Sequence, residues 1–447
     1  MEKYSMNNKF NIDSFNADER KSALLECAAD YKSSGNGTLF NMHCHSFFSY
    51  NSEGWSPSHI VCNAAKADLY AAALCDFDVL DGMREFIEAG RIMDLRTAVH
   101  LETRAYVPEL SAAEISSPGE PGVTYIMGCG FTSMPSEGSA AKATLDMLRN
   151  GAQNRNLALI QRINTQLPAI AIDYQQDVTP LTPKGVATER HIVRAYRERA
   201  EQVFSDPTQQ ASFWAPLLKC TVDEFPALRT NIPKFEDLIR NALAKRGGIG
   251  YIQPTPQTFP TAADFVQWVL QCNAIPTIAW LDGTSDGESN AEALLALMCD
   301  IGCAALNIIP DRNWNYKDAE TAALKQKKLD EIIRAAVKRD MPINIGTEMN
   351  KGGLPFVDDI NGTILKKYAD EFTCGANIMV GQSILTEFAD LPYCAEKTAA
   401  MFKNNKERNN FFAAVGALPP LTVEQAEKFR DIGPDATLDY LRCQLAD

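Results

Sequence analysis

Two histidines one residue apart open the part of the sequence in which chemistry is expected. His43 and His45 stand within residues 39–54, directly behind apolar residues that predict the end of a buried strand. Successive strand side chains point to opposite faces, so both imidazoles should project to the same side and Cys44 away from it. Such a pair suits a metal ion. An isolated H-x-H is more often one packed and one solvated histidine, so the interpretation depends on the rest of the chain.

Other polar side chains follow further predicted strands. Strands are predicted at residues 69–75, 97–101, 123–127, 248–253, 275–281, 303–309, 342–346 and 376–380. Their alternation with helical patterns predicts a parallel sheet whose polar residues gather at the carboxyl ends of the strands. Beyond the two histidines, the polar and aromatic residues at these ends are Asp76, Asp78, Glu102, Tyr125, Trp280, Asp282, Asp311, Arg312, Glu348 and Asn350.

The predicted elements divide the chain into four parts. Residues 1–38 form an N-terminal helical lead. One α/β barrel is expected in residues 39–135 and 247–354, interrupted by a mainly helical insertion at 136–246. Residues 355–447 are expected to be mostly helical and to complete the barrel.

Composition narrows the class of protein. The chain has 447 residues, 45% of them hydrophobic, and a net charge of −14, which disfavours nucleic acid as a general partner. No apolar run of spanning length and no secretory pattern occurs, so we expect a cytoplasmic protein without a membrane partner. The twelve cysteines include no C-x-x-C pair, and reduced thiols are the simplest expectation. The sequence leaves the oligomeric state open.

The order and spacing of these motifs resemble the polymerase-and-histidinol-phosphatase (PHP) superfamily. NMHCHS resembles the family's opening H-x-H motif, and LETR carries its bridging glutamate as Glu102. The resemblance covers residues 40–130 and 248–353, and the helical part between them resembles the insertion of a subgroup that hydrolyses nucleotide phosphates. It implies a distorted seven-stranded (β/α) barrel, similar to a TIM barrel, that acts as a metal-dependent phosphoesterase.

Four histidines of the family pattern are replaced. DFDVLDG resembles the second motif, D-H-(D/N)-x-x-D-G, with Phe77 at the ligand histidine. TYIMG resembles H-x-x-G with Tyr125, and IAWLDG resembles A-H-P-G with Trp280. GTEMN resembles G-(S/T)-D-x-H with Glu348 for the aspartate and Asn350 for the histidine. Aromatic rings cannot replace imidazole as a ligand, so fewer than the family's three ions are expected.

The resemblance also implies roles for individual residues. His43, His45 and Glu102 would hold a divalent metal, for which Zn²⁺, Mn²⁺ and Fe²⁺ are comparably suited, and Asp76 or Glu348 would manage protons. TERHIVRAY resembles the family's T-R-x-H-x-x-R helix motif beside the phosphate site, with the arginine displaced. The predicted substrate-binding residues are Arg104, Arg190, His191, Trp280, Arg312 and Lys351.

Two functions remain open at this point. One is a metal-dependent hydrolase whose partner is a small-molecule phosphate ester or another metabolite. The alternative is a barrel that has lost catalysis and binds a small molecule through an aromatic-lined mouth. The retained histidines favour the first, and the aromatic replacements favour the second.

Overall fold

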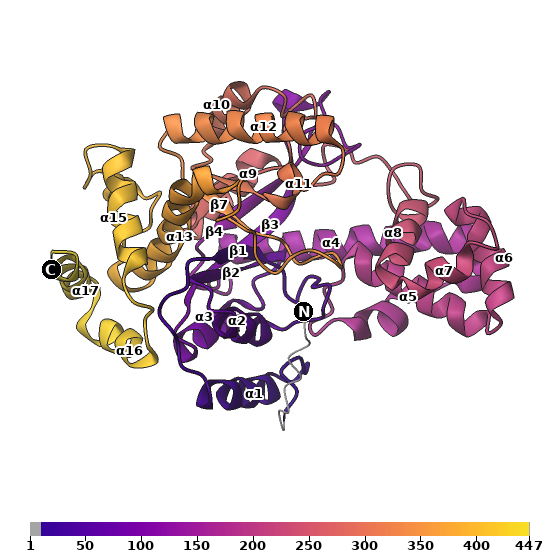
Figure 1. Cartoon of the computed structure of the whole chain (residues 1–447), viewed down its shortest axis with the longest axis horizontal. Helices are drawn as coiled ribbons and strands as arrows, with labels where there is room; N and C mark the ends of the chain where they lie inside the picture. The colour runs from indigo at the N-terminus through magenta and orange to yellow at the C-terminus, as the bar shows by residue number, and fades with distance from the viewer. Residues whose placement is uncertain (1–9, 447) are drawn as a thin grey trace.

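A computed structural model describes residues 10–446, and its centre is one seven-stranded sheet in which the strands neighbour one another in chain order. The strands are β1 (Phe40–Cys44), β2 (Ala71–Phe77), β3 (Arg96–Tyr106), β4 (Val123–Cys129), β5 (Ile275–Trp280), β6 (Ala305–Ile308) and β7 (Ile343–Ile345). The sheet curves until its edges meet (Figure 1). His45 N donates to Glu348 O at 2.8 Å and Glu348 N donates to His43 O at 2.7 Å, which joins β1 to the chain after β7. The predicted α/β barrel is therefore confirmed.

One strand departs from the predicted parallel arrangement. β4 runs antiparallel to both β3 and β5, whereas the other neighbouring pairs are parallel. The connection from β3 to β4 holds only the short 3₁₀ helix η1 (Pro108–Leu110). A parallel return needs a crossover that normally includes a full helix, so the chain instead turns back beside the strand it has just left.

Helices cover the outside of the barrel. α2 begins after Ser56, whose side chain accepts a hydrogen bond from His59 N, as the pattern predicts. The helices outside the insertion and before the C-terminal part are α1 (Ala17–Ala29), α2 (Pro57–Lys66), α3 (Met83–Ile92), α9 (Ala262–Gln271), α10 (Ala291–Ile301), α11 (Asp311–Trp314) and α12 (Ala319–Lys338).

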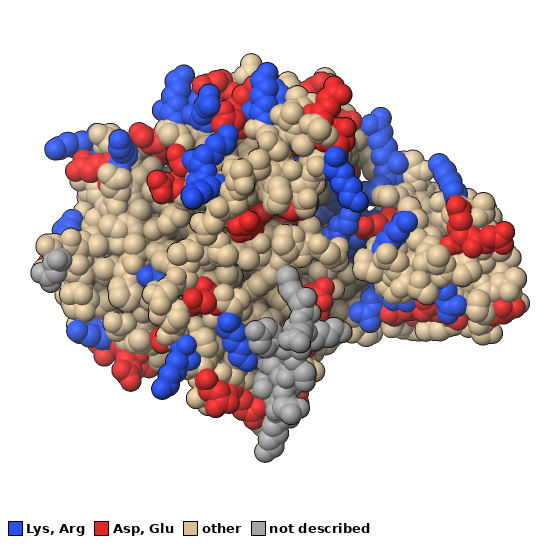
Figure 2. All heavy atoms as spheres, in the orientation of Figure 1, with Lys and Arg blue, Asp and Glu red and all other residues tan. Residues whose placement is uncertain are grey.

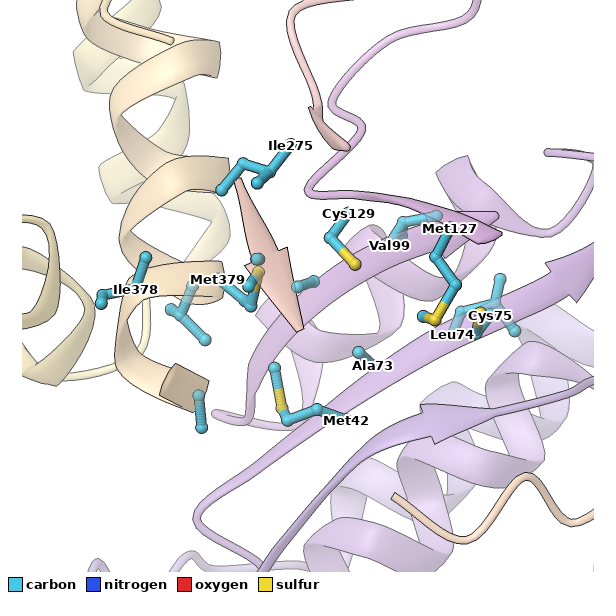
Figure 3. Packing of buried hydrophobic residues seen from close by; sticks show 14 of the residues in the cluster. Met42, Ala73, Leu74, Cys75, Val99, Met127, Cys129, Ile275, Ile378 and Met379 are labelled. Atoms are coloured by element: carbon cyan, nitrogen blue, oxygen red, sulfur yellow. The ribbon is translucent and has the colours of Figure 1, made fainter. Parts of the chain in front are cut away.

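The C-terminal part packs against the end of the barrel at which the parallel strands begin, because Gly375 lies against the backbone of Ile343 and Arg96 donates to Gly416 O. The predicted strand at 376–380 is wrong, because these residues lie inside the buried helix α13 (Ala369–Ala389). A short apolar run cannot be told from a segment of a buried helix by periodicity alone. Figure 3 shows Ile378 and Met379 of α13 packed beside the sheet. The other elements here are η5 (Lys366–Tyr368), α14 (Glu396–Ala399), α15 (Asn405–Ala417), α16 (Val423–Ile432) and α17 (Pro434–Gln444).

The insertion between β4 and β5 is a helical lobe with its own core. α4 contributes to the cores of both the barrel and the lobe. Its residues Leu145 and Leu148 pack in the barrel core, and Ile160 and Ile163 pack in the core of the lobe. Figure 1 shows α4 running out of the barrel into the lobe formed with α5 to α8. The helices are α4 (Ala140–Gln166), α5 (Glu189–Val203), α6 (Pro207–Leu218), α7 (Phe225–Thr230) and α8 (Ile232–Leu243), with the short helices η2 (Pro168–Ile170), η3 (Tyr174–Val178) and η4 (Thr179–Leu181). The strand predicted at 248–253 is absent, and those residues form turns and coil.

Two further expectations can be compared with the structure. Cys27 of α1 and Cys62 of α2 form a disulfide, so the expectation of twelve reduced cysteines is wrong for this pair. The two residues are 35 positions apart in the sequence, and no spacing rule connects them. Among residues 10–446, no helix combines the length and the apolar character that a membrane span requires. Residues 1–9 of the predicted N-terminal lead lie outside the described residues.

Candidate metal centre

His43, His45 and Glu102 meet at the mouth of the barrel, and we call them the His-His-Glu cluster. The Nε2 atoms of both histidines lie 3.5 Å from the same oxygen, Glu102 Oε2. Glu102 comes from β3, two strands away from β1, and the three ligand atoms all lie within 4.8 Å of one another. The two imidazoles project to the same side, as strand alternation predicts. Two nitrogen ligands and one carboxylate are a suitable donor set for a divalent transition metal or zinc.

The cluster is buried and its facing atoms lack partners. The side chains of His43 and His45 are 0% exposed and that of Glu102 is 4% exposed. His43 Nε2, His45 Nε2 and Glu102 Oε2 have no hydrogen-bond partner among the described residues. Buried polar atoms without partners cost free energy, and several such atoms facing one point are stabilised by a cation there. The residues therefore fit a metal ion.

The electrostatics of the cluster agree with a cation site. Burial lowers the pKa of His43, but Glu102 and Glu348 outweigh this effect and raise it above its usual value. Burial likewise opposes the ionisation of Glu102, but the two histidines hold its pKa well below its usual range. The carboxylate is thus stabilised in its charged form, which is the form that binds metals.

Two residues that the sequence did not suggest contact the outer sides of the imidazoles. His43 Nδ1 lies 3.4 Å from Asn307 Oδ1 on β6, and His45 Nδ1 lies 3.3 Å from Ser49 Oγ. Asn307 could have been found as the single amide within the apolar run of its strand. Ser49 carries no comparable signal, because hydroxyls are common in turns.

Asp76 does not face the cluster. Its oxygens accept hydrogen bonds from Ser46 N, Ser46 Oγ and Ser49 Oγ, each at 2.7 Å. Burial raises its pKa. Asp76 precedes Phe77 on β2, so alternation puts it on the outer face when Phe77 points to the cluster. Asp76 therefore holds the turn after β1, and the structure does not bring it to the metal ligands.

Phe77, for which the resemblance implied a ligand position, forms part of the wall of the cluster. Its ring is stacked on that of His45, with centroids 4.4 Å apart and an interplanar angle of 19°. Its register partner on β3 is Glu102, and Tyr125 lies 6.2 Å from it between ring centroids. An aromatic ring therefore fills the space beside His45.

Glu348 and Arg312 reach the mouth together. Arg312 Nη2 and Glu348 Oε2 are 2.5 Å apart. Glu348 has a φ of 64°, a left-handed conformation that is fixed by its two backbone hydrogen bonds to His43 and His45. Glu348 and, more weakly, Tyr125 and Glu102 raise the pKa of Arg312.

Arg104 lies farther out on the same strand as Glu102. Its guanidinium donates to Glu120 at 2.9 Å and lies 4.4 Å from the ring centroid of Phe259. Its register partner is Tyr125, which also interacts electrostatically with it. The structure thus brings Arg104 to the rim of the cluster.

Three of the predicted substrate-binding residues lie in the contact between the insertion and the barrel mouth. Arg190 and Lys351 both pair with Asp237 of α8, at 2.6 and 3.1 Å. His191 is buried, its Nδ1 accepts a hydrogen bond from Thr188 N at 3.1 Å, and its ring lies 5.1 Å from that of Tyr50. The structure does not bring these three to the cluster. Figure 2 shows basic side chains along the junction between the lobe and the barrel.

Trp280 points away from the cluster. On β5, Thr277 is paired with Met127, which is in turn paired with Glu102. Alternation then puts Trp280 on the opposite face from Thr277. Its ring packs against Gly283, where an added Cβ would lie 3.0 Å from Trp280 Cζ2. The predicted contact with substrate is therefore not supported, and the mouth is less aromatic than expected.

Comparisons with known proteins are distant. No family model matches the sequence, and no curated protein matches it. A structure of a candidate metal-dependent phosphoesterase from Bifidobacterium adolescentis is similar with a TM-score of 0.46 and 17% identity, over 74% of this chain and 96% of that one. An amidohydrolase from Chromobacterium violaceum, with bound sulfate and no metal, is similar with a TM-score of 0.46 and 15% identity over the same shares. At these levels, neither likeness assigns an activity to this chain.

Proposed function

We propose that this protein is a metal-dependent hydrolase of phosphate esters with a reduced metal site of the PHP type. The observation that carries the proposal is the convergence of three buried, unpartnered polar atoms from His43, His45 and Glu102. His43, His45 and Glu102 would hold a divalent ion, which would act as a Lewis acid on a phosphoryl oxygen and would lower the pKa of bound water. Phe77 beside His45 supports fewer than three ions.

The residues around the cluster supply the other parts of such a site. A dianionic phosphate requires cations, and guanidinium groups suit it by geometry. Arg312 and Arg104 both interact electrostatically with Tyr125, and they are the candidates to bind the phosphate. Glu348 interacts with His43 and is the candidate to accept a proton from water.

Access to the cluster requires movement. The ligand side chains are nearly inaccessible to solvent, and the lobe contacts the mouth through Asp237, through His191 with Tyr50, and through Val186. We propose that the lobe acts as a cap that moves away to admit substrate. Closure would exclude water, which strengthens electrostatic interactions with the substrate.

The test combines metal analysis with kinetics. Protein purified without chelators is analysed for metals, and hydrolysis of a panel of phosphate esters is measured with added Zn²⁺, Mn²⁺ or Fe²⁺. Replacing His43 and His45 together by alanine should abolish both metal binding and hydrolysis. His59→Ala is the matched control, because this histidine of α2 pairs with Asp13 and takes no part in the cluster.

The contrary result is equally defined. If the wild type hydrolyses no ester with any of the three metals, the proposal that this protein is a hydrolase is overturned. Tight binding of an uncharged metabolite by the same protein would then support the alternative, a barrel that binds without catalysis.

A further inference from the structure

The Nδ1 atom of each imidazole in the His-His-Glu cluster lies at the end of a chain of hydrogen bonds. Each of these chains starts at a group that can only accept hydrogen bonds. Such a group fixes the position of every hydrogen along the chain that leads from it. The two hydrogen-bond chains, one to His45 and one to His43, share no residue. Together they determine which nitrogen of each ring carries a hydrogen.

The chain to His45 begins at Asp76. Ser49 Oγ lies 2.7 Å from Asp76 Oδ1, an oxygen that also accepts from Ser46 N. A hydroxyl so close to a carboxylate oxygen must point its hydrogen at that oxygen, and serine has only one. The 3.3 Å contact between Ser49 Oγ and His45 Nδ1 must therefore use a hydrogen carried by Nδ1.

The chain to His43 begins at the backbone carbonyl of Met42. Asn344 Nδ2 donates to this carbonyl at 3.0 Å and to Asn307 Oδ1 at 2.8 Å. Because a carbonyl only accepts, the orientation of the Asn344 amide is fixed, and Asn307 must present oxygen to it. That oxygen can only accept from His43 Nδ1, 3.4 Å away, so this nitrogen also carries a hydrogen.

We infer that Ser49 and Asn307 are positioning residues that hold both histidines as Nδ1–H tautomers, with the Nε2 lone pairs aimed at Glu102 Oε2. The inference rests on the proposed metal site, and it names Nε2 as the metal-binding atom of each ring. It also assigns a role to Asp76, because its carboxylate is the acceptor at which the hydrogen-bond chain to His45 starts. Outer partners of this kind orient ligands and raise their affinity for metal.

The direct test is the tautomer of each ring. The chain has five histidines, so protein labelled with ¹⁵N in histidine gives few enough ring signals to assign by point variants. Long-range ¹H–¹⁵N correlation of metal-free protein, at a pH where the imidazoles are neutral, should show Nδ1–H for His43 and His45. With Zn²⁺ added, both Nε2 signals should shift as ligands. A neutral Nε2–H form of either ring, or coordination through Nδ1, would overturn the inference.

Variants of Ser49 give an independent readout. Ser49→Ala removes the acceptor and should raise the Kd for Zn²⁺ roughly 10- to 100-fold, whereas Ser49→Thr keeps the hydroxyl and should stay near wild type. Ser52→Ala is the control in the same loop. Equal affinities of Ser49→Ala and Ser52→Ala would overturn the role of Ser49. The tautomers are read without metal or substrate, so a protein with the expected tautomers and no hydrolysis would refute only the proposed function.

Discussion

The barrel mouth and the helical lobe both bury histidine, but they do so in different ways. His191 in the lobe completes a capping box with Thr188, and both its burial and the nearby Arg194 lower its pKa to about 3. His43 in the mouth faces a carboxylate through a nitrogen that has no partner, and its pKa is raised. Burial of a titratable side chain is therefore not the mark of a functional site. What distinguishes a functional site is a group of buried polar atoms that face one another and have no hydrogen-bond partners.

The largest expected effect, a complete loss of metal binding, tests the mouth. Glu102→Gln replaces the only carboxylate of the cluster by a neutral amide, and we expect metal binding to be lost. Zn²⁺ at 100 times its Kd should stabilise the wild type by about 2.7 kcal/mol and the variant not at all. Urea unfolding with and without Zn²⁺ measures this. His191→Gln, the matched change in the lobe, should keep the full stabilisation, and its loss there would contradict the comparison.

The second effect concerns the disulfide on the barrel side. Cys27 and Cys62 are separated by 35 positions in the sequence. A disulfide that closes a loop of this length lowers the entropy of the unfolded chain and so stabilises the fold by about 4 kcal/mol. Replacing both cysteines by serine should lower the free energy of unfolding by roughly this amount. Denaturant titration checks it, and a reducing agent should affect the wild type in the same direction and leave the variant unchanged. A wild type insensitive to reduction would mean that the pair is not bonded in solution.

The third effect sharpens the account of His191. Its pKa is about 3 in the folded protein and 6.5 in the unfolded chain, so between these values only the unfolded chain binds the proton. Stability from this residue is complete above about pH 6.5 and falls by up to about 1.4 kcal/mol per pH unit below it. His191→Gln can keep the cap and should remove that share of the acid sensitivity. Urea titrations at pH 7 and pH 5 measure the free energy of unfolding of the wild type and the variant. If this free energy changes equally with pH in both proteins, the prediction is refuted.

The sequence predicted the mouth better than its surroundings. Strand alternation and the resemblance brought His43, His45 and Glu102 together correctly, because a strand fixes both the direction and the spacing of its side chains. Trp280 and Asp76 lie on the opposite face of their strands, and motif position alone does not say which face of a strand a residue occupies. Ser49 and Asn307 depend on contacts between distant elements, and no local pattern reports those.

The smallest expected effect tests the link between the two regions. Asp237 joins Arg190 of the lobe to Lys351 of the loop after β7, at partly exposed positions. Such pairs contribute at most about 1 kcal/mol, so Asp237→Asn should change stability little. If the lobe must move for the cluster to exchange its ion, the variant should release Zn²⁺ to a chelator faster than the wild type with an unchanged Kd. Asp330→Asn, which disturbs a similar pairing with Arg334 and Lys367 outside the barrel, is the control. Stopped-flow chelation measures the release, and equal rates in all three proteins would show that the metal leaves by a route that does not involve the lobe.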